Sequence, residues 1–140
     1  GEPKRWPADR FREIGRRLLE DPSTILLITG GPGEGPILEE ARFSLPTDRA
    51  LIYAPDPIPD LVAMIRHTHF AIGNDTGPLH IAAGAGVPSW GLFGPTRGAR
   101  NGPYGSHCGY LQSATGKIDD LSVDEVWKAI RPSTTARPAR

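Results

Sequence analysis

The residues from Gly73 to His80, which read Gly-Asn-Asp-Thr-Gly-Pro-Leu-His, have the types and spacing of an anion-binding turn. A short apolar run precedes them, and Pro78 stands where a proline commonly opens a helix. The first turn of a helix has unpaired backbone N–H groups and the positive end of the helix dipole, and both attract an anion. His80 falls near that turn, where its ring N–H could reach the same group. The pattern predicts a phosphate or diphosphate site.

A simpler interpretation of this turn needs no ligand. Asp75 or Thr76 would cap the helix by accepting a backbone N–H, and His80 would be an ordinary hydrogen-bonded helix residue. The following helix, residues 81–86, is built of small side chains, which would let it lie close to a sheet or let a ligand approach its backbone. The turn taken alone leaves both interpretations open.

Alternating strands and helices must position this turn. The sequence predicts strands over residues 24–29, 50–53, 70–72, 89–93 and 110–112, and helices from Pro7 and over residues 36–43, 60–67, 78–85 and 122–130. The run at 24–29 is continuously apolar and β-branched, as expected of a strand buried on both faces of a parallel sheet. Ser122 and Glu125 have the spacing of a capping box. The alternation predicts an α/β fold, a Rossmann-like three-layer domain with a parallel sheet, whose ligands bind at the carboxyl ends of the strands.

Length and composition limit the classes that remain. The chain has 140 residues, with 16 Lys and Arg against 16 Asp and Glu and a single cysteine, Cys108. We expect one domain over residues 1–131 and a disordered tail over 132–140, where no apolar periodicity remains. Balanced charge gives no global field to recruit nucleic acid, so we expect no nucleic-acid partner. One cysteine cannot form an internal disulfide, and no apolar run approaches the length of a membrane span. Trp90 and Trp127 are predicted core residues.

The segment from Asn74 to Thr96, NDTGPLHIAAGAGVPSWGLFGPT, resembles the signature of the family 9 glycosyltransferases, which include the ADP-heptose:lipopolysaccharide heptosyltransferases. Three flanking pieces resemble the same family in the same order. They are Lys4-Arg5-Trp6-Pro7, the loop from Gly30 to Glu34, and Gly102-Pro103-Tyr104-Gly105. The resemblance covers about residues 4 to 130.

This resemblance implies the C-terminal half of a two-domain GT-B enzyme, which binds a nucleotide-diphosphate sugar, usually ADP-heptose. Lys4 matches the family lysine that meets the donor diphosphate, and Glu34 matches the acidic residue that hydrogen-bonds the ribose. Asp75 matches the acid near the donor sugar. The diphosphate cradle at the helix start is matched by Thr76, Gly77 and His80.

The chemistry of these residue types fits the implied roles. A diphosphate leaving group gains negative charge as the glycosidic bond breaks, and Lys4 with a helix N-terminus would stabilise that charge without a metal. The carboxylate of Glu34 can accept from both hydroxyls of a ribose, although a solvated loop carboxylate is the alternative. The pair His67 and His69 lacks further ligands. We therefore expect no metal and no cofactor.

The resemblance also implies partners outside the chain. The family's catalytic base belongs to an N-terminal acceptor-binding domain, so we expect no catalytic residue here and little or no transfer by this chain alone. The full enzyme would transfer the sugar with inversion to a lipopolysaccharide core acceptor, in the cytoplasm or peripherally at the inner membrane. Two other interpretations stay open. One is a stand-alone nucleotide-binding module without catalysis, and the other is a Rossmann-type oxidoreductase, which ranks low because no G-x-G-x-x-G follows the first strand.

Overall fold

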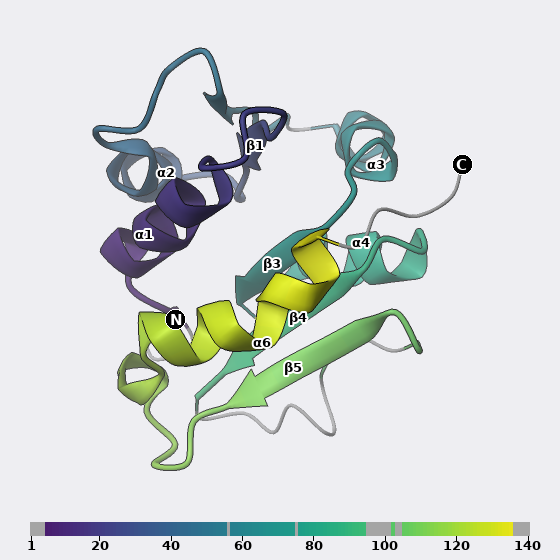
Figure 1. The fold of residues 1–140 in the computed structure, drawn as a ribbon. Coiled ribbons are helices and arrows are strands. Elements are labelled where there is room, and N and C mark those ends of the chain that lie inside the picture. Colours follow the sequence, from purple (N-terminus) through teal and green to yellow (C-terminus); the bar gives the residue numbers. More distant parts are fainter. Residues whose placement is uncertain (1–4, 56, 75, 95–101, 103–104, 136–140) are drawn as a thin grey trace. The chain divides into compact units, whose positions relative to one another are not determined.

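The computed structural model describes residues 5–55, 57–74, 76–94, 102 and 105–135. The chain divides into two compact units, one of residues 7–61 and one of residues 1–6 and 62–140, where the sequence predicts a single domain over 1–131. The predicted α/β class with parallel strands is confirmed (Figure 1). The strands form two hydrogen-bonded sheets, one of two strands and one of three.

The unit of residues 7–61 carries the two-stranded sheet. Its elements are α1 (Ala8–Leu18), β1 (Leu26–Ile28), α2 (Gly35–Arg42) and β2 (Ala50–Ile52). The helix α1 begins after Pro7, as the sequence predicts. Strands β1 and β2 run parallel, with Leu27 opposite Leu51. The helix α3 (Ile58–Arg66) follows at the boundary between the units.

Close packing on one face of this sheet holds the unit together. Leu19, Leu45 and Ala50 are buried, and Leu26 and Ile28 pack against them. Arg49, the residue before β2, adds polar contacts to this packing. Its guanidinium donates hydrogen bonds to backbone carbonyl oxygens between α1 and β1. The acceptors are the carbonyl oxygens of Leu19, Asp21 and Thr24.

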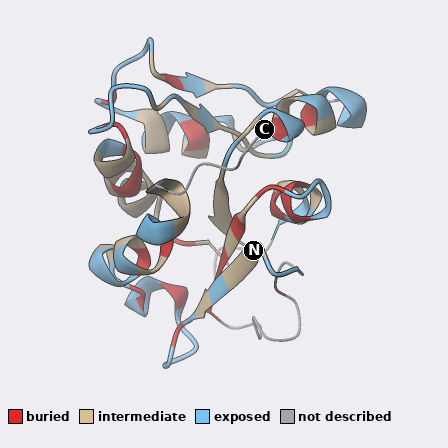
Figure 2. Cartoon of the chain, turned by 45° about the vertical axis from the view of Figure 1, so that its right-hand side comes forward, coloured by how far each residue is buried: buried red, intermediate tan, exposed pale blue. Residues whose placement is uncertain are grey.

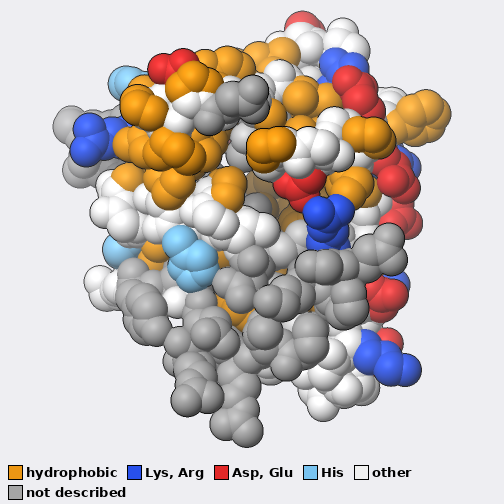
Figure 3. Space-filling model, turned by 180° about the vertical axis from the view of Figure 1, so that it is seen from behind, with side chains coloured by type: hydrophobic (Ala, Val, Ile, Leu, Met, Phe, Trp, Pro, Cys, Tyr) orange, Lys and Arg blue, Asp and Glu red, His pale blue; other side chains and the backbone are white. Residues whose placement is uncertain are grey.

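The other face of the two-stranded sheet is open, which corrects the prediction that residues 24–29 form a strand buried on both faces. Leu27 is 40% exposed and its register partner Leu51 is 39% exposed. Ile25 and Tyr53, beside the strand ends, are also exposed. Figure 3 shows hydrophobic side chains open to solvent in the upper part of the view. An unbroken apolar run predicts that both faces of a strand are buried. Whether each face is buried depends on which element packs against it.

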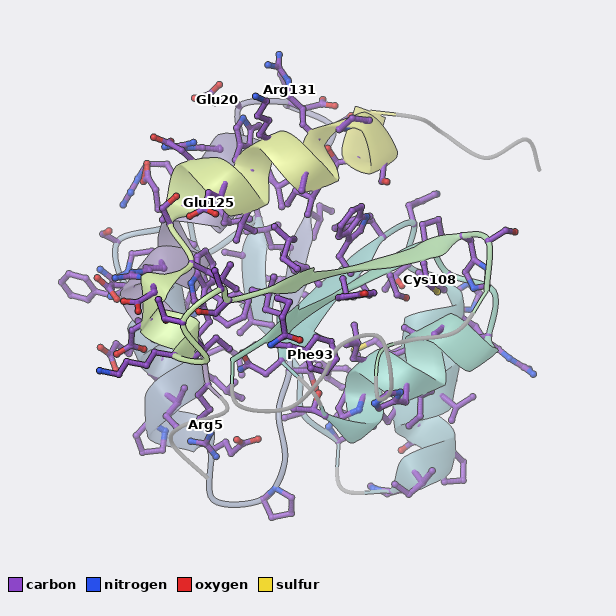
Figure 4. All side chains as sticks on the ribbon, turned by 90° about the horizontal axis from the view of Figure 1, so that it is seen from below. Arg5, Glu20, Phe93, Cys108, Glu125 and Arg131 are labelled. Atoms are coloured by element: carbon purple, nitrogen blue, oxygen red, sulfur yellow. The ribbon has the colours of Figure 1, made fainter. Side chains whose placement is uncertain are left out.

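The second unit carries the three-stranded parallel sheet in the order β3-β4-β5. Its elements are β3 (Ala71–Asn74), α4 (Gly77–Gly84), β4 (Ser89–Phe93), β5 (Cys108–Gln112), the 3-10 helix η2 (Ile118–Asp120) and α6 (Val123–Thr135). The register places Asn74 opposite Leu92 and Leu92 opposite Leu111. The helices α4 and α6 lie on opposite faces of this sheet (Figures 1 and 4). Most predicted boundaries agree with the structure to within two residues.

The core of the second unit contains a tryptophan that the sequence analysis did not place there. Trp6 is 2% exposed, and its indole Nε1–H donates to the carbonyl oxygen of Leu121 at 2.9 Å. Trp90 and Trp127, the predicted core tryptophans, are only half-buried. The burial of all described residues is drawn in Figure 2. The residue type alone therefore did not show which of the three tryptophans is buried in this core.

The helix α6 starts with the predicted capping box. The Glu125 backbone N–H donates to Ser122 Oγ and the Ser122 backbone N–H donates to Glu125 Oε1, both at 3.1 Å. Val126 and Ile130 are fully buried, as the predicted apolar stripe requires. The helix continues through Pro132 to Thr135, so residues 132–135 are helical where the sequence predicts disorder, and residues 136–140 lie outside the described part. None of the described helices combines the length and the hydropathy that a membrane span needs.

Candidate functional site

The predicted anion-binding turn lies at the carboxyl end of β3. The strand ends at Asn74, Thr76 is the N-cap residue in extended conformation (φ −137°, ψ 163°), and α4 begins at Gly77 with Pro78 in its first turn. The side chain of Thr76 makes no capping hydrogen bond. The predicted helix start is therefore confirmed, and the interpretation in which Thr76 merely caps the helix finds no support in its contacts.

The side chains of α4 divide between the sheet and the solvent. Leu79, Ala82 and Ala83 are buried, and the small alanines let the helix axis lie close to β3 and β4. His80 is exposed, and its backbone N–H donates to the Thr76 carbonyl oxygen at 3.3 Å. The imidazole is thus in contact with solvent, where an incoming ligand could reach it.

Gly77 leaves open space at the first position of the helix. A methyl group built on its Cα would meet no described atom within 4 Å, and its backbone does not require a positive φ. Nothing in the described fold therefore demands glycine at this position. The absence of a side chain is what a ligand that closely approaches the helix backbone would need.

The two charged residues predicted beside this turn, Lys4 and Asp75, lie outside the described residues. Their neighbours are described. Trp6, two positions after Lys4, donates its backbone N–H to Asn74 Oδ1 at 2.8 Å, and Asn74 immediately precedes Asp75. Sequence reasoning missed this hydrogen bond because the two residues are 68 positions apart in the chain.

Glu34 belongs to the other unit, where it is the N-cap residue of α2 after β1. Its carboxylate turns back onto its own loop, because Oε1 accepts the Gly31 backbone N–H at 2.5 Å. A methyl group at Gly30 would lie 2.8 Å from the same oxygen, so Gly30 has to lack a side chain for this arrangement. The loop of Gly30 to Glu34 is thus organised around the carboxylate, and a role toward a ribose remains a prediction.

Among the described residues, no three His, Cys, Asp or Glu side chains gather closely enough to hold a metal ion. Cys108, the first residue of β5, has a free thiol. Figure 4 shows Cys108 and Arg5, the neighbour of Trp6, on opposite sides of the second unit. Burial raises the pKa of the Cys108 thiol above its ordinary value, and hydrogen bonds from Ser89 offset only part of that effect.

We expect Cys108 to react slowly with iodoacetamide at pH 8, because a raised pKa leaves less of the nucleophilic thiolate. The folded state favours the neutral thiol of Cys108 over the thiolate. The stability that this preference contributes is fully present below the pKa of the thiol in the unfolded chain, and it is lost as the pH rises through the higher pKa of the thiol in the folded chain. Alkylation rates measured by mass spectrometry from pH 7 to 10 should stay below those of the urea-unfolded chain until the pH passes the folded pKa. Equal rates for the folded and unfolded chains would contradict a suppressed thiolate.

Comparison with known proteins places these elements in a family. The sequence model of glycosyltransferase family 9 (heptosyltransferase) matches residues 1–129. The chain belongs to this family. Residues Thr76, Gly77, His80 and Glu34 all lie within the matched range, as do Lys4 and Asp75.

Named relatives of the family 9 chain are similar over part of their length. Lipopolysaccharide heptosyltransferase 1 of Pseudomonas aeruginosa is 28% identical over 102 residues, which are 73% of this chain and 28% of that protein. The structure described as E. coli heptosyltransferase WaaC with ADP superposes with a TM-score of 0.83 and 21% identity, over 95% of this chain and 41% of that one. The structure of E. coli ADP-heptose lps heptosyltransferase II gives a TM-score of 0.83 and 22% identity, over 96% and 43%. The chain thus spans less than half the length of these relatives, and the two structures establish the shared fold.

Proposed function

We propose that this chain is the donor-binding half of a heptosyltransferase-like glycosyltransferase. It binds a nucleotide-diphosphate sugar, ADP-heptose, and holds it for transfer to a hydroxyl of a lipopolysaccharide core acceptor. Membership of family 9 supports the reaction class, and the fold shared with a heptosyltransferase structure described with ADP supports the donor. The observation that carries the proposal is the start of α4, where a helix opens at the carboxyl end of β3 with bare glycine at its first position.

The donor diphosphate binds at that helix start. The backbone N–H groups of the first turn and the helix dipole attract it, and the exposed imidazole of His80 approaches from the solvent side. Lys4 adds a full positive charge, and Asp75 lies near the donor sugar. Glu34 accepts from the ribose hydroxyls with the carboxylate that organises its own loop.

Catalysis in this proposal is the stabilisation of a leaving group. As the bond between the sugar and the diphosphate breaks, negative charge accumulates on the phosphate oxygens, and preorganised N–H donors with a lysine stabilise it where it develops. The acceptor hydroxyl attacks the anomeric carbon from the opposite side and inverts its configuration. The base that removes the hydroxyl proton comes from the acceptor-binding domain.

Gly77→Val tests the binding site, with Gly84→Ala as its matched control. Both glycines lie in α4 with no described atom within 4 Å of an added methyl, but Gly84 is at the opposite end of the helix. Gly77→Val should weaken ADP binding about 10- to 100-fold, because the added side chain would hold the phosphate away from the backbone N–H groups, and losing a charge-assisted hydrogen bond costs about 1.5 to 3 kcal/mol. Gly84→Ala should leave ADP affinity unchanged and add about 0.5 to 1 kcal/mol of stability.

Titration calorimetry with ADP, adenosine and NAD measures these effects, and thermal unfolding checks that both variants fold. Adenosine binding, which lacks the phosphates, should not respond to Gly77→Val. Unchanged ADP affinity in Gly77→Val would remove the start of α4 from the donor site. A wild-type chain that binds NAD but not ADP would favour an oxidoreductase. A chain that binds ADP-heptose yet supports no transfer when the acceptor-binding domain is supplied would be a non-catalytic binding module.

A further inference from the structure

The carboxylate of Glu34 is held in one position by its own loop. Its Oε1 accepts the Gly31 backbone N–H, and the Glu34 backbone N–H donates to the Gly31 carbonyl oxygen at 3.2 Å. The Glu34 carbonyl oxygen accepts the N–H groups of Ile37 and Leu38, in the first turn of α2, at 3.0 and 3.1 Å. The backbone of Glu34 and the end of its side chain are therefore both fixed by contacts within the unit of residues 7–61.

Gly30 makes this position of the carboxylate possible. A methyl group on its Cα would lie 2.8 Å from Glu34 Oε1 and 3.1 Å from Leu38 Cδ2, so the neighbouring atoms would have to move. Both atoms are the ends of flexible side chains, and the backbone of Gly30 has no positive φ. An alanine at this position would thus displace the carboxylate of Glu34 and leave the backbone of the loop in place.

A carboxylate fixed at this point suits the hydroxyl groups of a sugar. Glu34 lies in the loop that follows the parallel strand β1, at the end of the strand where α/β sheets bind their ligands. The two oxygens of a carboxylate accept about four hydrogen bonds in all, and the Gly31 N–H uses one of them. This N–H also means that a ligand lacking one hydroxyl does not leave the carboxylate unpaired. The loss of one ligand hydroxyl should therefore weaken binding moderately.

We propose that the Gly30 position makes the donor site selective for ribonucleotides over 2′-deoxyribonucleotides, by leaving room for the folded-back carboxylate of Glu34. The inference rests on the proposed function, in which Glu34 accepts from the ribose hydroxyls. Gly30 is a positioning residue, since it acts on the ribose only through Glu34. The carboxylate is already ordered in the free chain, so a ribose hydroxyl binds without having to immobilise a flexible side chain.

The first experiment measures the position of the carboxylate without any ligand, by amide hydrogen exchange at Gly31. The rate in each folded variant is divided by the rate in the urea-unfolded form of the same variant, which cancels the effects of neighbouring residue types. Glu34→Ala removes the acceptor and Gly30→Ala displaces it. Each should lower the protection of the Gly31 amide at least about fivefold, in the range of losing one hydrogen bond.

Two variants in the same segment are matched controls. Gly35→Ala adds a methyl that meets no described atom within 4 Å, and Gly35 has no positive φ. Glu39→Ala removes another carboxylate of α2, one that pairs with Arg42. Both variants should leave the protection of the Gly31 amide unchanged.

The second experiment compares the affinities for ADP and 2′-deoxy-ADP by titration calorimetry. The wild-type chain should bind ADP about 5- to 20-fold more tightly, because 2′-deoxy-ADP lacks one hydroxyl that donates to the carboxylate. Gly30→Ala and Glu34→Ala should each bring the two affinities to within about twofold of each other, and Gly35→Ala and Glu39→Ala should keep the wild-type ratio. The double variant Gly30→Ala/Glu34→Ala should match Glu34→Ala, because Gly30 acts only through Glu34.

The outcomes separate this proposal from the proposed function. Unchanged Gly31 protection in Gly30→Ala would overturn the proposal, as would lost protection with the wild-type ratio of affinities. A wild-type chain that binds ADP and 2′-deoxy-ADP equally would also overturn it, and the proposed donor site at α4 would stand. A wild-type chain that binds no ADP would overturn the proposed function and this proposal with it, and the exchange rates would still show whether Gly30 places the carboxylate. Loss of fold would weaken both nucleotides equally, and thermal unfolding midpoints would reveal it.

Discussion

Truncating Trp6 to alanine should lower the free energy of unfolding of the second unit by about 3 to 5 kcal/mol, the usual cost of removing a large buried aromatic side chain. The indole is 2% exposed, so the variant leaves a cavity that its surroundings can fill only in part. It also leaves the Leu121 carbonyl oxygen without the indole donor. Urea unfolding followed by circular dichroism measures the loss.

Two comparisons separate packing from hydrogen bonding at this site. Trp6→Phe retains most of the apolar area but lacks the indole N–H, and we expect an intermediate loss of about 1 to 3 kcal/mol. Trp127→Ala removes a tryptophan that is only half-buried, and its loss should be smaller than that of Trp6→Ala. If both truncations cost the same, the buried position of Trp6 is wrong.

The second large effect is expected from Gly94→Ala, at the end of β4. A methyl group there would lie 2.5 Å from the Ile118 backbone nitrogen and 2.9 Å from the Ile118 Cα. These are backbone atoms of η2, so the overlap cannot be relieved by rotating a side chain. We expect a loss of about 3 kcal/mol or more in the free energy of unfolding, at the upper end for overpacking.

Gly84→Ala is the control for this prediction as well, because its added methyl meets only open space among the described residues. The backbone at Gly94 has no positive φ, so the contrast between the two variants isolates the steric effect. Gln112 Nε2–H donates to the Gly94 carbonyl oxygen at 2.8 Å, and any shift of the backbone at Gly94 would also disturb this bond. Thermal unfolding midpoints of the two variants that differ by less than a degree would show that β4 and η2 are not packed this closely.

These two packing positions lie in the same unit as the start of α4. Trp6 and Gly94 both connect the three-stranded sheet to the segment around η2, and Asn74 lies on the adjacent strand of that sheet. A diphosphate site requires that the carboxyl ends of these strands are rigid, because the N–H hydrogen-bond donors must be held in place before negative charge develops on the phosphate. Variants at these positions therefore need the folding controls described above before any change in ADP affinity is assigned to the site.

The sequence by itself determined the elements whose signals are local. The strand Ser89–Phe93 has the predicted bounds, and the capping box at Ser122 and Glu125 forms as its spacing requires. The helix start after Thr76 was also readable, because the proline and glycine that punctuate it act on their own backbone. Family 9 membership followed from the same ordered string and was confirmed by the match over residues 1–129.

Only the tertiary structure decided which residues are buried and what they hold. Trp6 bonds to partners 68 and 115 positions away, and no periodicity or propensity reports a contact of that separation. The open face at Leu27 has the same cause, since a strand's apolar pattern does not show which element covers it. Pro132 lies inside α6 although local rules place a helix end before it. The next residue, Ser133, accepts the Trp90 indole N–H across 43 positions of the chain, a contact that no local rule reports. Local chemistry thus set the turn at Thr76, and long-range hydrogen bonds and packing set the position of Trp6.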